Sequence, residues 1–222
     1  MKRRLIIFLK APRAGLVKTR LAAGMGPARA LHAYERLVQT LLERLATIQR
    51  VELRFAPDDS AGEVARWLRE GWTSRAQGGG GLGERLCRAF REAFESGARQ
   101  VVVIGSDCPD VTPADIETAW AALATDDVAL GPAADGGYWL VGLRALHEPI
   151  FRGIHWSTSS VLAQTLAICQ QRGLSVHRLR ELSDVDTEED WSRFLQAQKN
   201  SASASVRRPA AKPSARKPML NR

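Results

Sequence analysis

The sequence predicts a single α/β domain of three layers, with a mostly parallel β-sheet between two layers of helices. Short, continuously apolar segments alternate along the chain with longer segments whose apolar residues recur at helical spacing. The first examples are the apolar run Leu5–Leu9 and the periodic segment from Pro27 to about Ile48. No segment repeats at a period of about 20–50 residues, so we expect one domain without internal duplication.

The remaining elements follow in the same alternating order. Further strands are predicted at Val51–Ala56, Thr73–Gln77, Val101–Ile104, Val128–Leu130, Tyr138–Leu143 and Ser175–Leu179. Further helices are predicted after a capping box at Ser60 and Glu63, after the four glycines Gly78 to Gly81, from an N-cap at Thr112 to Ala124, over Ser159–Arg172 and after Thr187.

The positive charge of the chain is concentrated at its C-terminal end. The 222 residues carry a formal net charge of +8, and seven basic residues but no acidic one lie from Lys199 onward. Residues 1–198 are therefore almost neutral, which argues against a nucleic-acid-binding surface on the body of the protein. Residues 200–222 are rich in Ser, Ala and Pro, so we predict a domain over residues 1–198 and a basic disordered tail over residues 199–222.

The cysteines and the apolar runs favour a cytoplasmic protein without a membrane span. The three cysteines, Cys87, Cys108 and Cys169, form no CxxC pair, as expected of reduced thiols. The apolar run after the basic N-terminus is about five residues long, too short for a signal peptide. No run approaches the roughly 20 apolar residues that a membrane span needs.

Two carboxylates three positions apart follow the strand at Val101–Ile104. Asp107 and Asp110 come after Gly105 and Ser106, at the carboxyl end of a predicted parallel strand, where open α/β sheets bind ligands. Carboxylates in this position suit Mg²⁺ or Mn²⁺, and such a cation suits a phosphate. The alternative is that both residues only end the strand and cap the next helix.

A loop with four basic residues follows the first strand and reads Lys10-Ala-Pro-Arg-Ala-Gly-Leu-Val-Lys-Thr-Arg-Leu21. Loop amides, cations and a helix N-terminus together suit a polyphosphate. Gly15 lies three residues before Lys18 with no glycine beside that lysine, so the loop is not a Walker A loop. A solvated surface loop is the alternative.

Two glycine-containing segments also favour contact with a ligand. The run from Gly78 to Gly81 opens a helix with Leu82-Gly83-Glu84-Arg85 and would let a backbone approach a ligand closely. The turn at Asp135-Gly136-Gly137 would present Asp135 to a sugar or nucleotide. A flexible linker and a plain hairpin turn are the respective alternatives.

Two polar segments near the C-terminal end have both functional and structural interpretations. His155, beside Trp156, could act as an acid or base, although a packed histidine in a helix cap fits as well. Asp184 or Asp186 could supply a further metal or acceptor contact. Thr187 and the acidic residues after it are equally typical of helix capping.

Six motifs occur in an order that resembles the bacterial DUF2064 family. They are Lys10-x-Pro-x-x-Gly-x-x-Lys-Thr-Arg-Leu, Leu82-Gly-Glu-Arg, Gly105-Ser-Asp-Cys-Pro, Asp135-Gly-Gly-Tyr, Trp156-Ser-Thr and Asp184-Val-Asp-Thr. The resemblance covers roughly residues 3–197. The chain departs from the family at Gly81, where Asp or Asn is usual, and at Ala134, where an acidic residue is common.

The resemblance implies a GT-A fold, which is the fold of nucleotide-diphospho-sugar transferases. The family is often labelled glycosyltransferase-like and linked by name to arsenosugar biosynthesis, and it is similar to the phospholactate guanylyltransferases of cofactor F420 biosynthesis. By position, Asp107 would stand at the metal-binding acid and Asp135 in the acceptor-side turn. The residues expected to contact the nucleotide are Pro12, Gly15, Lys18, Arg20, Gly83, Arg85 and Ser106.

The leading hypothesis is a metal-dependent transferase with a nucleotide-diphosphate-sugar donor and a small-molecule acceptor. Asp107 and Asp110 would hold Mg²⁺ or Mn²⁺, and Asp135, with Asp186 second, would be the acceptor base. The first alternative is a nucleotidyltransferase that uses a nucleoside triphosphate and releases pyrophosphate. The second is a non-catalytic nucleotide-binding protein whose basic tail binds nucleic acid.

Overall fold

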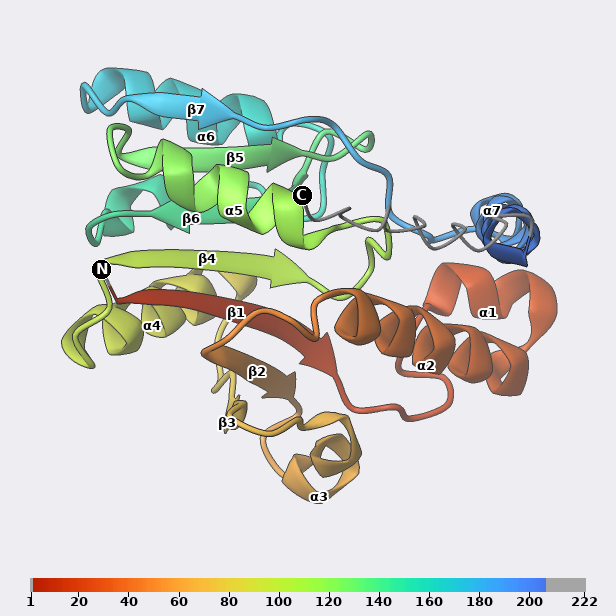
Figure 1. Ribbon diagram of the computed structural model, residues 1–222. Helices are drawn as coiled ribbons and strands as arrows, with labels where there is room; N and C mark the ends of the chain where they lie inside the picture. The colour runs from red at the N-terminus through yellow and green to blue at the C-terminus, as the bar shows by residue number, and fades with distance from the viewer. Residues whose placement is uncertain (1, 207–222) are drawn as a thin grey trace, which may run out of the picture.

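The computed structural model describes residues 2–206, and the side chains of residues 2–200. Within this part of the chain, seven strands form one sheet in the order β3-β2-β1-β4-β6-β5-β7. They are β1 (Arg3–Lys10), β2 (Val51–Ala56), β3 (Thr73–Ala76), β4 (Gln100–Gly105), β5 (Val128–Pro132), β6 (Tyr138–Leu143) and β7 (Val176–Arg178). Only β6 runs against its neighbours β4 and β5 (Figure 1). The predicted mostly parallel sheet is confirmed.

Helices cover both faces of this sheet, which confirms the three-layer architecture. They are α1 (Thr19–Met25), α2 (Pro27–Arg44), α3 (Ala61–Val64), α4 (Leu82–Glu95), α5 (Pro113–Ala122), α6 (Val161–Gln171) and α7 (Glu188–Val206), with short 3₁₀ turns η1 (Ala65–Trp67) and η2 (Glu148–Phe151). Helices α2 and α5 pack on one face, and α4 and α6 pack on the other (Figure 1).

The central strand β1 is apolar on both faces because both faces are covered. Leu5, Ile7 and Leu9 join the core on the side of α2 and α5, whereas Ile6 joins the core on the side of α4. Each of these four side chains is at most 2% exposed. Burial on both faces explains why the strand reads as a continuous apolar run rather than as an alternating one.

The two predicted helix caps have different outcomes. The Thr112 hydroxyl accepts a hydrogen bond from the Asp115 amide, and the Asp115 carboxylate accepts one from the Thr112 amide, so α5 has the predicted capping box. The prediction of a capping box at Ser60 is wrong. The Ser60 hydroxyl donates instead to the carbonyl of Pro57, at 2.5 Å, and Glu63 pairs with Arg13.

Two helices differ from the prediction. The structure adds helix α1 before α2, and Gly26, with φ +85°, separates them. Helix α7 continues to Val206, so residues 199–206 of the predicted tail are helical. No Gly or Pro interrupts α7, and alanine favours the helix strongly. The rest of the predicted tail lies outside the described residues.

None of the described helices is both long and apolar enough to cross a membrane.

The strand order changes direction between β1 and β4. The chain passes from β1 to β2 and β3 on one side and then crosses to β4 on the other side of β1. The loops that leave the carboxyl ends of β1 and β4 therefore diverge, and a crevice opens between them. Helices α1 and α7 stand over this edge of the sheet (Figure 1).

Candidate active site

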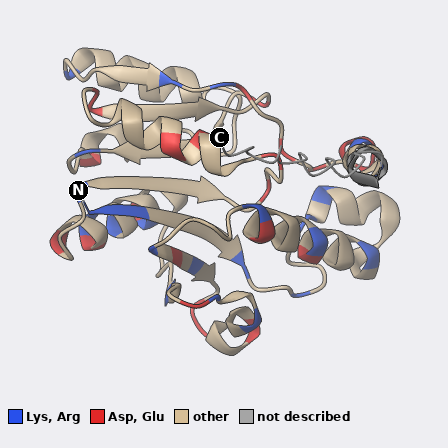
Figure 2. Cartoon of the chain, viewed as in Figure 1, with Lys and Arg blue, Asp and Glu red and all other residues tan. Residues whose placement is uncertain are grey.

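A cavity of about 600 Å³ lies at the carboxyl ends of β1 and β4. Its walls come from the loop after β1, the start of α1, the glycine loop before α4, the end of β4 and the segment before α7. Figure 2 shows acidic positions in the loops at this edge and basic positions on the helices beside it. The cavity therefore occupies the crevice in which open α/β sheets bind their ligands.

Lys18 is the buried cation of this cavity. Its ammonium lies 2.6 Å from Oδ1 of Asp107 and 3.0 Å from Oδ1 of Asp186, and its side chain is 3% exposed. Burial alone would lower the pKa of Lys18, but the two carboxylates more than offset this and hold that pKa above its ordinary value. Lys18 is therefore a permanent positive charge at the bottom of the crevice.

The backbone of Lys18 has an uncommon conformation that helps to place its side chain. Its φ of 47° and ψ of 49° are left-handed, and the residue directly precedes α1. Such a conformation costs about 1 kcal/mol or more for a residue other than glycine. The surrounding structure overcomes that cost and turns the side chain toward Asp107 and Asp186.

The segment before α7 brings the carboxylate of Asp186 to the cavity and also carries Asp184, which does not line it. The Val185 amide donates to the carbonyl of Asp107, at 3.0 Å, which joins this segment to the end of β4. Burial, followed by repulsion from Asp107, raises the pKa of Asp184 to about 7. The Asp186 carboxylate also lies 3.6 Å from the guanidinium of Arg20.

Tyr34 of α2 fixes the part of the cavity wall that is formed by the end of β1. The Tyr34 hydroxyl accepts a hydrogen bond from the Lys10 amide, at 2.8 Å, and donates to the Lys10 carbonyl, at 2.9 Å. Both Tyr34 and Ser106 line the cavity and are almost completely buried. The end of β1 is thereby tied to α2 at the point where the basic loop begins.

The opposite end of the cavity is formed by Gln77 and the glycine loop. The Gln77 side-chain amide donates to the carbonyls of Leu9 and Arg54, at 3.0 Å each, and so ties the loop to β1 and β2. Gly80, Gly81 and Arg85 line this end. Here the ligand would meet backbone and a guanidinium group rather than carboxylates.

The structure brings six of the residues expected at the site to one cavity. They are Lys18, Arg20, Arg85, Ser106, Asp107 and Asp186. Pro12 and Gly15 belong to the loop after β1 but do not line the cavity. Asp110 lies outside it as well, because its carboxylate pairs with Arg44 on α2, at 3.0 Å.

Two other expected residues have local structural roles. Gly83 packs against the carbonyl of Phe151 and the indole of Trp156, where a Cβ atom would come within 3 Å of each. The Asp135 carboxylate accepts a hydrogen bond from the Gly137 amide, at 2.9 Å, and thus stabilises its own turn. Neither Gly83 nor Asp135 lines the cavity.

Other lining residues were not expected from the sequence. Tyr34, Gln77 and Ser157 all line the cavity. Ser157 carried a signal in its polar segment, and its φ of 63° places it in the left-handed region. Nothing in the sequence distinguishes Tyr34 from the other core residues of α2.

The carboxylates of the cavity fit a hard divalent cation that is also held by substrate. No group of three His, Cys, Asp or Glu side chains forms a ready-made metal site among the described residues. Asp107 and Asp186 nevertheless share the Lys18 ammonium, and both interact electrostatically with Asp184, whose pKa is raised first by burial and then by repulsion from Asp107. Mg²⁺ is typically held by one or two carboxylates together with substrate phosphates, which these residues could supply in part.

The fold and the cavity define the structural class of the nucleotidyl and nucleotide-sugar transferases. A crystal structure from Desulfovibrio desulfuricans G20, described as a candidate nucleotide-diphospho-sugar transferase, is 34% identical and has a TM-score of 0.83 over 95% of this chain and 92% of that chain. The structure of Rv0371c from Mycobacterium tuberculosis H37Rv in complex with manganese is 16% identical, with a TM-score of 0.52 over 89% of this chain and 100% of that chain. The latter likeness concerns the fold alone.

The chain belongs to the DUF2064 family, which is described as uncharacterised proteins conserved in bacteria. The model of this family matches residues 40–158. A curated relative, the phosphoenolpyruvate guanylyltransferase of Sphaerobacter thermophilus, is 29% identical over 193 residues, which cover 83% of this chain and 89% of the relative. The predicted family and the predicted GT-A-like fold are thus both confirmed.

Proposed function

We propose that the protein is a nucleotidyltransferase that joins a nucleoside triphosphate to a small phosphorylated acid and releases pyrophosphate. The observation that carries this proposal is the Lys18 ammonium, buried between Asp107 and Asp186 at the floor of the cavity. A permanent cation among carboxylates, in a crevice at the strand ends, suits the transfer of a phosphate-centred group. The guanylyltransferase named among the relatives supports this choice.

The two ends of the cavity suit the two ends of a nucleotide. Lys18 and Arg20 would neutralise the phosphates, and Arg20, whose side chain is 71% exposed, would do so from the outer side of Asp186. The nucleoside would then extend toward Gly80, Gly81 and Arg85 at the other end. Glycines expose flat backbone there, so a planar base could approach closely.

Asp107, Asp184 and Asp186 would hold Mg²⁺ or Mn²⁺ together with the substrate phosphates. When bound, the cation would neutralise charge that develops on the phosphates during transfer. The manganese in the Rv0371c structure supports a cation of this type in the same fold. Asp110 is not included in this set, because it pairs with Arg44 outside the cavity.

The chemistry requires no general base when the acceptor is a phosphate. An ionised phosphate oxygen of the acceptor would attack the α-phosphorus of the triphosphate, and the bond from that phosphorus to the bridging oxygen would break. Pyrophosphate would leave with the bonding electrons, and Lys18 would stabilise the charge on the transferred group. The position of Asp135 outside the cavity lining is consistent with this scheme.

A direct assay would measure pyrophosphate release by the full chain with each of the four nucleoside triphosphates. Phosphoenolpyruvate is the first acceptor to test, followed by other small phosphorylated acids, each with Mg²⁺ or Mn²⁺. We expect pyrophosphate to form only when both a triphosphate and an acceptor are present. Turnover of a nucleotide-diphosphate-sugar without pyrophosphate release would contradict the proposal.

The second candidate function is glycosyl transfer from a nucleotide-diphosphate-sugar. Asp186 favours it, since this carboxylate lines the cavity and could serve as an acceptor base. The description of the Desulfovibrio protein also supports it. Asp186 is paired with Lys18 and Arg20, however, so its two carboxylate oxygens are already engaged by cations rather than open to an acceptor hydroxyl.

A further inference from the structure

The glycine loop before α4 has no side chains with which to hold its own shape. Gly78 and Gly80 have φ values of +78° and +96°, which only glycine adopts readily. A Cβ atom added at Gly79 would meet no other atom within 4 Å. Because four successive glycines lose much conformational entropy on ordering, contacts from outside the loop must fix it.

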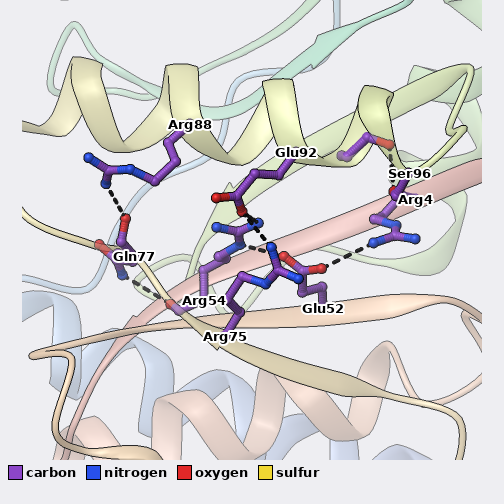
Figure 3. Close-up of polar contacts among 9 residues, drawn as sticks. Arg4, Glu52, Arg54, Arg75, Gln77, Arg88, Glu92 and Ser96 are labelled. Atoms are coloured by element: carbon purple, nitrogen blue, oxygen red, sulfur yellow. Dashed lines mark hydrogen bonds and ion pairs between the residues drawn. The ribbon is translucent and has the colours of Figure 1, made fainter.

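Asp58 and Glu84 accept hydrogen bonds from the amides of Gly78 and Gly81, and an arginine of α4 binds two carbonyls of the segment. The Arg88 guanidinium donates to the carbonyl of Gln77, at 2.5 Å, and to the carbonyl of Gly79, at 3.0 Å. Figure 3 shows Arg88 reaching from α4 to Gln77, whose side chain points toward the sheet. One guanidinium thus spans the first half of the loop from a rigid helix.

The guanidinium of Arg88 also packs directly against the loop backbone. A Cβ atom on Gly78 would lie 2.4 Å from Nη1 of Arg88, so the arginine occupies space that only glycine leaves open. Gln77, the other end of this bridge, is anchored in the sheet through its side-chain amide. The loop is therefore held between α4 and the ends of β1 and β2.

Arg88 differs from its neighbour Arg85 in its relation to the cavity. Arg85 donates to the carbonyl of Gly80, at 2.8 Å, and also lines the candidate active site. Arg88 does not line that site and instead lines a second cavity, which shares Gly81 with the first. Any effect of Arg88 on a nucleotide must therefore pass through the glycine loop.

We propose that Arg88 is a positioning residue, which holds the glycine loop in the shape that binds the nucleotide. This inference rests on the proposed function, because it assigns the loop end of the cavity to the nucleoside. The loop carbonyls that Arg88 engages remain turned toward α4. The face of the loop at Gly80 and Gly81 is thereby kept open toward the cavity.

The test compares Arg88→Ala, Arg88→Lys and the control Arg91→Ala in the full chain. Arg91 lies one turn further along α4 and pairs with Glu148, without contact to the glycine loop. Steady-state kinetics would give KM for the nucleotide and kcat, and hydrogen exchange would give the protection of residues 77–81. Thermal unfolding would show that all three variants are folded.

We expect Arg88→Ala to raise KM for the nucleotide about tenfold, or about 1.4 kcal/mol, with kcat changed less than about twofold. Exchange over residues 77–81 should increase in parallel. Arg88→Lys should recover part of both effects, and Arg91→Ala should match the wild type. Unchanged exchange in Arg88→Ala, or faster exchange with an unchanged KM, would overturn the inference. If the wild type turns over no nucleotide, the proposed function fails, while the exchange data still decide whether Arg88 fixes the loop.

Discussion

The ammonium group of Lys18 lies 2.6 Å from Oδ1 of Asp107 and joins the loop after β1 to the end of β4. The two partners are unequally buried, since the side chain of Lys18 is 3% exposed and that of Asp107 is 49% exposed. The lysine can therefore remain in place while the outer side of the aspartate meets a ligand. This pair links the two loops that define the crevice.

Replacement of Lys18 should impair catalysis far more than it impairs folding. In Lys18→Met the phosphates would lose their innermost cation, and we expect kcat/KM to fall about 100-fold or more. Lys18→Arg should not fully restore activity, because a planar guanidinium does not reproduce the compact charge that the ammonium places between Asp107 and Asp186. Steady-state kinetics on folded variants provides the measurement. Activity within about threefold of the wild type in Lys18→Met would contradict this role.

Asp184 should make the stability of the cation-free protein depend on pH. Its pKa is about 7 in the folded protein, against an ordinary value of 3.8, owing first to burial and then to Asp107. The folded state therefore binds the proton more tightly than the unfolded state, and the free energy of unfolding falls as pH rises between these two values. Above about pH 7 the ionised Asp184 is destabilising.

The variant Asp184→Asn isolates this effect. At about pH 8 it should be more stable than the wild type by an amount on the order of 1–4 kcal/mol, and the advantage should shrink toward pH 4. Urea unfolding in the presence of EDTA would measure both proteins across this range. A stability difference that does not change with pH would show that Asp184 titrates normally.

The turn at Gly136 should not tolerate a side chain. Gly136 has φ +87°, and a Cβ atom there would lie 2.1 Å from the carbonyl oxygen of Ser159. We expect Gly136→Ala to lower the free energy of unfolding by about 2 kcal/mol or more. Gly62→Ala is the matched control, because Gly62 is helical and has open space around it; it should stabilise the protein by about 0.5–1 kcal/mol. Equal stability of both variants would count against the close contact.

The chain beyond α7 should be dispensable for catalysis. We propose that the folded domain ends with this helix, whose Phe194 packs against Leu37 of α2 and Val185 beside the cavity. A chain that ends at Val206 should keep the kcat and KM of the full protein. A large loss of activity in the shortened chain would place the basic residues after α7 among the functional ones.

Local patterns predicted most of the fold because this sheet is covered on both faces. A buried strand such as β4 has an uninterrupted apolar sequence. The start of α5 is indicated by Thr112, Pro113 and Asp115. The Ser60 prediction failed because the same hydroxyl had a nearby carbonyl to bind, and no sequence pattern separates these two outcomes.

The site residues that directly follow a strand could be predicted from the sequence. Those whose position depends on packing between distant parts of the chain could not. Ser106 and Asp107 lie in the crevice because β4 delivers them there. Lys18 meets Asp186 across 168 positions of sequence, and this contact depends on the path of the whole chain. The same holds for the burial of Asp184, the position of Asp110 on Arg44 and the inward hydroxyl of Tyr34.

The most direct test of the account compares two aspartates that follow the same strand. Asp107 lines the cavity beside Lys18, whereas Asp110 pairs with Arg44 outside it. Pyrophosphate release from a nucleoside triphosphate and a phosphorylated acceptor would be measured for Asp107→Asn and Asp110→Asn over a range of Mn²⁺ concentrations. We predict a loss of about 100-fold or more in Asp107→Asn that added Mn²⁺ does not restore, and near wild-type rates in Asp110→Asn. Equal activities of the two variants would contradict the assignment of the active site.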